Sequence, residues 1–120
     1  MKRTVLYIDD EEVNLRTFRS AFRRDYTIMT ALGGKEGLRI LETESPDVLI
    51  TDERMPGMSG VELLKRFWEL YPSSKVARIL LSGYAETAAI NEAKEKYMLK
   101  HFVSKPWCRE ALKKTIDSAV

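Results

Sequence analysis

Short apolar runs rich in valine and isoleucine alternate with longer segments of helical periodicity along the whole chain. The runs predict five strands, at 5–8, 26–31, 48–51, 77–81 and 101–104. After each run, apolar residues recur every three or four positions, which predicts a helix. The residues expected to face the core from these helices are Leu15, Phe18 and Phe22; Leu38 and Leu41; Leu64, Phe67, Trp68 and Tyr71; Ile90, Ala93 and Tyr97; and Leu112, Ile116 and Ala119. The alternation predicts an α/β fold in which five βα units form a doubly wound parallel sheet between two layers of helices.

The composition is that of one globular domain, which we place at residues 1–120. Hydrophobic residues make up 44% and charged residues 32%. A net charge of +2 is too small to indicate a surface that binds nucleic acid. The longest unbroken apolar run has four residues, so we expect no membrane span and no secretory signal peptide. A single cysteine, Cys108, indicates a reduced, cytoplasmic setting. Both a single-domain protein and the first part of a longer one fit this chain.

Polar side chains end or follow four of the predicted strands. They are Asp9 and Asp10, Asp52, Ser82, and Lys105. Taken singly, each has an ordinary explanation, such as helix capping for the acids and a solvated surface charge for Lys105. Ligands of parallel α/β sheets bind at the carboxyl ends of the strands, where these residues would meet. Three carboxylates and one ammonium leave a charge that one Mg²⁺ would neutralise, so the sequence predicts a magnesium site there.

Four segments resemble those of a known family. They are LYIDDEE, LITDERMPGMSG, LLSGYAE and VSKP, and their order and spacing match as well. The chain resembles the receiver domain of bacterial two-component response regulators from Val5 to Ile116. The resemblance implies a flavodoxin-like fold of three layers with strand order 2-1-3-4-5. It also implies a cis peptide bond between Lys105 and Pro106.

The resemblance implies a role for each residue of the site. Asp52 would be the phosphoacceptor, which takes a phosphoryl group from a phosphohistidine of a sensor histidine kinase or phosphotransfer protein. Lys105 would pair with one phosphoryl oxygen, and Ser82 would donate a hydrogen bond to another. The implied Mg²⁺ ligands are all oxygen atoms, from the side chains of Asp9, Asp10 and Asp52 and the backbone carbonyl group of Arg54.

A conformational switch is expected from the same residues. Phe102 lies three positions before Lys105, where such domains carry a switch aromatic. On phosphorylation, Ser82 would move inward, and Phe102 would rotate into the space that Ser82 leaves. The face formed by the fourth helix, fifth strand and fifth helix would then change shape. An output domain or downstream protein would bind this face. Phe102 lacks the hydroxyl of a tyrosine, so the switch would act through packing.

Three residues are expected at the rim of the pocket. Gly83 leaves room for the phosphoryl group, whereas Arg54 and Tyr84 are bulky and would screen it from water, which predicts a phosphoryl lifetime of minutes or more. Two interpretations of Trp107 stay open: a first-turn residue on the sheet edge, and an anchor for a partner. A homodimer also stays open.

Other functions fit parts of the same pattern. The main alternative is a receiver-like module that binds proteins without phosphorylation, against which the intact acids, Ser82 and Lys105 argue. A Mg²⁺-dependent phosphatase would commonly carry a second aspartate at the position of Arg54, and the acidic first loop would repel the phosphate of a flavin. We therefore expect a signalling domain that catalyses only its own phosphorylation and dephosphorylation, without direct binding to nucleic acid or membranes.

Overall fold

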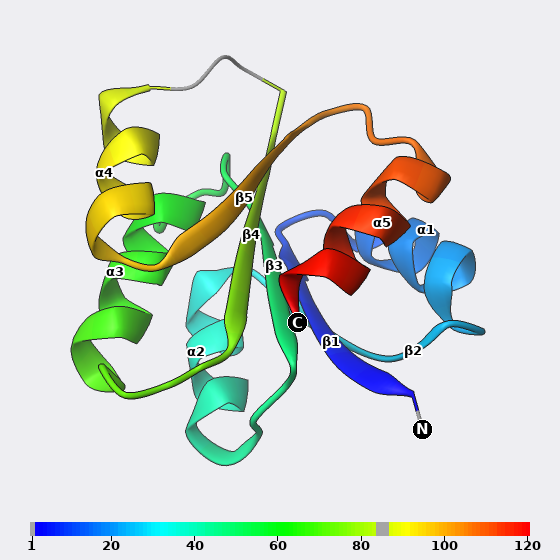
Figure 1. Cartoon of the computed structure of the whole chain (residues 1–120), viewed down its shortest axis with the longest axis horizontal. Helices are drawn as coiled ribbons and strands as arrows, with labels where there is room; N and C mark the ends of the chain where they lie inside the picture. Colours follow the sequence, from blue (N-terminus) through cyan, green and yellow to red (C-terminus); the bar gives the residue numbers. More distant parts are fainter. Residues whose placement is uncertain (1, 84–86) are drawn as a thin grey trace.

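The computed structural model describes residues 2–83 and 87–120. Within these ranges the elements are β1 (Arg3–Asp9), α1 (Glu12–Phe22), β2 (Tyr26–Leu32), α2 (Gly34–Thr43), β3 (Val48–Asp52), α3 (Gly60–Leu70), β4 (Ala77–Ser82), α4 (Ala88–Lys96), β5 (Leu99–Ser104) and α5 (Arg109–Ala119). All the strands pair in parallel, in the order β2-β1-β3-β4-β5. Figure 1 shows α1 and α5 on one face of the sheet and α2, α3 and α4 on the other. The predicted fold and strand order are confirmed.

Each face of the sheet buries its own apolar core. Alternate residues of β1 show the division, because Leu6 and Ile8 join the core beneath α2, α3 and α4, whereas Val5 and Tyr7 join the core beneath α1 and α5. The residues predicted to face the core do so from every helix; most are buried, and the half-buried ones are Leu38, Trp68 and Tyr71. None of the described helices is long and apolar enough to cross a membrane.

Several strands extend beyond the apolar runs that predict them. The largest differences are at the starts of β1, at Arg3 rather than Val5, and of β5, at Leu99 rather than His101. In the pairing of β4 with β5, Arg78 lies opposite Leu99 and Ile79 lies opposite His101, so one residue of β5 is passed over. Such an irregularity breaks the two-residue alternation from which a strand is predicted, and the beginning of β5 therefore escapes the pattern.

The segment between β5 and α5 and the first residue of α5 contact α1. Trp107 is half-buried, and its ring centroid lies 6.1 Å from that of Phe18 and 5.6 Å from that of Phe22. The Arg109 side chain donates a hydrogen bond to the Ala21 carbonyl group at 2.8 Å. These contacts support the interpretation of Trp107 as a packing residue, but it precedes α5 instead of lying in its first turn, and its ring packs on α1.

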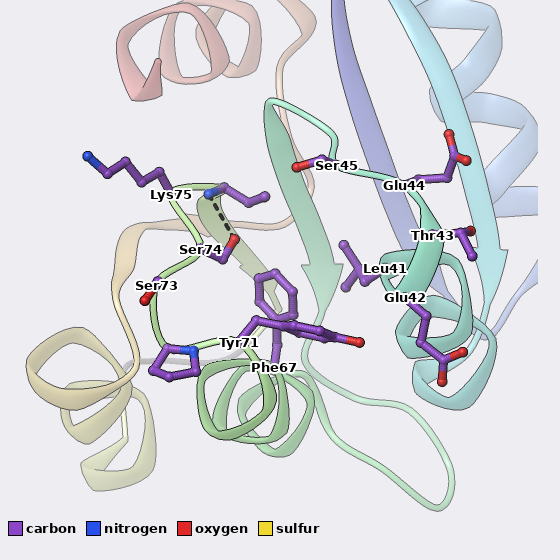
Figure 2. Close-up of a pocket in the computed structure, with 12 residues that line it drawn as sticks. Leu41, Glu42, Thr43, Glu44, Ser45, Phe67, Tyr71, Ser73, Ser74 and Lys75 are labelled. Atoms are coloured by element: carbon purple, nitrogen blue, oxygen red, sulfur yellow. Dashed lines mark hydrogen bonds between the residues drawn. The ribbon is translucent and has the colours of Figure 1, made fainter.

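A pocket of about 470 Å³ opens where strands β3 and β4 begin (Figure 2). Leu41 at the end of α2 and Phe67 and Tyr71 near the end of α3 supply its apolar wall. The rest of its lining comes from the last two residues of α2 and from the segments that follow α2 and α3. Because both strands run away from it, this pocket lies at the end of the sheet opposite to the predicted site.

Candidate functional site

Three acidic side chains meet at the carboxyl end of the sheet. Asp9 ends β1 and Asp52 ends β3, and the parallel pairing of these two strands brings their ends together. Asp10 follows directly, and one carboxylate oxygen of each acid lies within 4.8 Å of those of the other two. Asp9 is fully buried, Asp52 is 5% exposed, and Asp10 is half-buried. The structure thus gathers the three acids that the sequence predicts for a metal site.

Lys105 reaches this cluster from the loop after β5. Its ammonium nitrogen Nζ lies 2.7 Å from Oδ1 of Asp52. The backbone N–H group of Lys105 donates to the carbonyl group of Ser82 at 2.8 Å, and the bond between Lys105 and Pro106 is cis, as predicted. Burial lowers the pKa of Lys105, but the hydrogen bond and negative charge of Asp52 outweigh it, so the pKa is raised overall.

The environment of Asp52 opposes its ionisation and so favours a cation. Burial raises the pKa of the Asp52 carboxyl, the hydrogen bond and charge of Lys105 lower it, and the charges of Asp9 and Asp10 raise it again. The net pKa lies above the ordinary value of an aspartate because the single lysine does not fully offset burial and the charges of the two neighbouring carboxylates. A hard divalent cation with a preference for oxygen ligands would do so, and the three carboxylates fit Mg²⁺.

The loop after Asp52 is held in place by contacts at both ends. The backbone N–H group of Glu53 donates to the carbonyl group of Leu81 at 2.9 Å, and the Glu53 carboxylate accepts from the backbone N–H group of Val61 at 2.9 Å. A Cβ atom at Gly60 would lie 2.5 Å from the carbonyl oxygen of Asp52, so only glycine allows the start of α3 to pack this closely. The predicted turn-forming loop thus fixes the position of Asp52.

The other residues predicted for the site lie around the same edge. Ser82 is buried at the end of β4, and a Cβ atom at Gly83, the next residue, would meet only open space. Arg54 is exposed in the loop after β3. Phe102 on β5 is half-buried and packs against the core beneath α3 and α4. Tyr84 lies outside the described residues.

Two residues of the site were not predicted. The hydroxyl group of Tyr7 donates to Oδ2 of Asp9 at 2.8 Å. The side-chain nitrogen Nδ2 of Asn14 lies 3.3 Å from Oδ1 of Asp9 and 3.2 Å from Oδ2 of Asp9. Burial, followed by the charge of Asp9, raises the pKa of the Tyr7 hydroxyl, which therefore stays a donor. A signal for Tyr7 was present, because residues two apart in a strand point to the same side and a buried hydroxyl needs a partner. Asn14 had no comparable signal.

Comparison with known sequences points to one family. Residues 5–117 match the family model of the response regulator receiver domain. Sporulation initiation phosphotransferase F of Bacillus subtilis is 33% identical over 119 residues, which cover 95% of this chain and 94% of that protein. The hydrogenase transcriptional regulatory protein HoxA of Bradyrhizobium diazoefficiens is 32% identical over 117 residues, which cover 98% of this chain. The chain spans only 24% of the length of HoxA.

Solved protein structures with the same fold include a receiver domain and a chemotaxis protein. The receiver domain of an HD domain-containing protein from Pseudomonas fluorescens has a TM-score of 0.89 at 28% identity, with 99% of this chain and 94% of that chain covered. The chemotaxis protein CheY4 of Vibrio cholerae has a TM-score of 0.90 at 24% identity, with both chains fully covered. At this lower identity the likeness to CheY4 concerns the fold.

Proposed function

We propose that this chain, which belongs to the response regulator receiver domain family, accepts a phosphoryl group on Asp52 from a phosphohistidine of a sensor histidine kinase or phosphotransfer protein. The observation that supports this most directly is the contact of 2.7 Å between Lys105 and Asp52 inside a cluster of three carboxylates. A signalling domain of this kind transfers the group to itself and does not turn over a substrate. We take residues 1–120 as one such domain.

The proposed transfer needs a nucleophile, charge compensation and space. A carboxylate oxygen of Asp52 forms a bond to phosphorus while the phosphorus–nitrogen bond of the phosphohistidine breaks and the imidazole leaves. Lys105 then pairs with a phosphoryl oxygen, and Ser82 donates a hydrogen bond to another. Mg²⁺, when bound, would compensate charge on the phosphoryl oxygens. Its proposed ligands are the carboxylates of Asp9, Asp10 and Asp52 and the backbone carbonyl group of Arg54.

Incubation with phosphoramidate and Mg²⁺ tests this proposal. Mass spectrometry of the purified protein should show a gain of one phosphoryl group, and chelation of divalent ions by EDTA should prevent it. Asp52→Asn should abolish the gain because an amide is not a nucleophile here. The matched control is Glu53→Gln, which removes the neighbouring carboxylate and should leave the gain intact. A wild-type protein that gains no mass would leave a phosphorylation-independent binding module, and a gain that persists in Asp52→Asn would mean that another residue accepts the phosphoryl group.

We further propose that α4, β5 and α5 form the face that an output domain or downstream protein reads. Ser82 and Phe102 lie on neighbouring strands, where Leu80 pairs with Phe102 and Ser82 pairs with Ser104. A hydrogen bond to a charged group contributes about 1.5–3 kcal/mol. A shift of a two-state population from 1:99 to 99:1 takes about 5.5 kcal/mol. Ser82 and Lys105 closing on one phosphoryl group would therefore supply most of the energy of such a switch.

A stable acyl-phosphate mimic tests the switch. Adding beryllofluoride and Mg²⁺ should shift the amide NMR signals of residues 88–104 and 109–119 as well as those next to Asp52. Phe102→Ala should reduce the shifts on α4 and α5 while leaving those beside Asp52 in place. The amides of α2 serve as the internal reference. If the signals of α4 and α5 stay where they are in the wild-type protein, this part of the proposal is wrong.

A further inference from the structure

The Asp9 carboxylate is held by protein donors on both of its oxygens. Oδ1 accepts from the backbone N–H group of Glu11 at 3.0 Å and lies 3.3 Å from Nδ2 of Asn14. Oδ2 accepts from the Tyr7 hydroxyl at 2.8 Å and lies 3.2 Å from the same Asn14 nitrogen. Among the described residues, no comparable set of donors surrounds Asp10 or Asp52. Asp9 therefore has its orientation fixed before any ion is bound.

Tyr7 is itself fixed by packing. Its side chain is 2% exposed, and its ring stacks on that of Phe18 with a centroid separation of 4.3 Å and an interplanar angle of 17°. The hydroxyl group therefore has one position, directly beside Asp9. Because Asp9 is fully buried, a water molecule cannot replace a lost donor without rearrangement of the surrounding side chains. Removing the hydroxyl would leave Oδ2 of Asp9 with only the longer contact to Asn14.

We propose that Tyr7, with Asn14, is a positioning residue that holds the Asp9 carboxylate in the orientation in which it serves a Mg²⁺ ion. The inference rests on the proposed function, since it assumes that the three acids bind Mg²⁺. Groups that orient a metal ligand without touching the metal typically contribute a factor of 10–100 in metal affinity. Tyr7 is suited to this role because its rigid aromatic anchor lies in the core beneath α1 and α5.

Titration with Mg²⁺ alone tests the inference without any phosphoryl transfer. The dissociation constant is measured from the amide NMR signals of residues 9–14 in the wild-type protein and in Tyr7→Phe. We expect binding to weaken by about tenfold in Tyr7→Phe. Asn14→Ala, a change on the partly exposed start of α1, should also weaken binding and serves if Tyr7→Phe does not fold.

Tyr26→Phe is the matched control. Tyr26 is also a buried strand tyrosine, and its hydroxyl donates to a carboxylate, Oδ1 of Asp117, at 2.6 Å. Its partner lies on α5 and not in the acidic cluster, so Tyr26→Phe should lower stability and leave Mg²⁺ affinity unchanged. A purely structural role for Tyr7 would give the same result as this control.

The outcomes separate this inference from the proposed function. If the wild-type protein binds Mg²⁺ and Tyr7→Phe binds it within a factor of two or more tightly, the inference is overturned while the proposed function stands. Unchanged affinity in Asn14→Ala counts against it in the same way. If the wild-type protein binds no Mg²⁺ at all, both fail together.

Discussion

Arg78→Ala is expected to lower the free energy of unfolding by about 3–5 kcal/mol. Arg78 is fully buried in β4, and its guanidinium group donates to the carbonyl groups of Val76 at 3.2 Å, Tyr97 at 3.1 Å and Ser74 at 3.3 Å. It also lies 4.6 Å from the centre of the Phe67 ring. Truncation would leave three carbonyl groups without this donor and open a cavity beside α3, because the rest of the side chain is lost as well.

Urea denaturation followed by circular dichroism measures this effect. Arg109→Ala is the control, because Arg109 also donates to a backbone carbonyl group but is exposed, and its loss should cost about 1 kcal/mol or less. Arg78→Met restores most of the volume without donors and should recover the part of the loss that comes from the cavity. Equal stability losses for Arg78→Ala and Arg109→Ala would mean that the buried guanidinium group contributes no more stability than the exposed one.

Arg78 also shows where prediction of the fold from sequence stops. The apolar run at 77–81 predicts the strand correctly, but a binary pattern assigns a charged residue to the solvent side. The guanidinium group is buried because the segment before β4 and the end of α4 present carbonyl groups to it at the same place. That arrangement depends on how α3 and α4 pack, and no local pattern contains it. The predicted strand is thus correct, but the sequence does not show that the Arg78 side chain within it is buried.

The candidate site, like the fold, was predictable from the sequence only in part. Asp9, Asp52 and Lys105 were predictable because each ends or follows a strand, and the ends of parallel strands meet at one edge. The spacing of two residues places Tyr7 on the same side of β1 as Asp9. The hydrogen bonds of Tyr7 and Asn14 to Asp9 also depend on side-chain rotamers and on the stacking of Tyr7 on Phe18, which the sequence does not give. The order and spacing of residues along the chain therefore predicted the charged groups of the site. The groups that orient these charges could be identified only in the structure.

The mutual repulsion of the three acids predicts opposite effects of one substitution with and without Mg²⁺. In the metal-free protein, Asp10→Asn should raise the free energy of unfolding by about 1 kcal/mol, because it removes one of three charges within 4.8 Å of one another on a side chain that water partly screens. With Mg²⁺, the wild-type protein should gain about 2.7 kcal/mol at an ion concentration 100 times the dissociation constant. Asp10→Asn should gain much less, because it has lost one of the proposed charged ligands.

The two proteins should therefore exchange their order of stability during a Mg²⁺ titration of the urea midpoint. The variant is more stable in EDTA, and the wild-type protein is more stable at saturating Mg²⁺. Glu12→Gln is the control, since this exposed acid opens α1 near the cluster without belonging to it, and it should keep the full response to Mg²⁺. Parallel titration curves for the wild-type protein and Asp10→Asn would contradict a role for Asp10 in metal binding. A variant that is less stable in EDTA would show that the charge of Asp10 does not destabilise the metal-free fold.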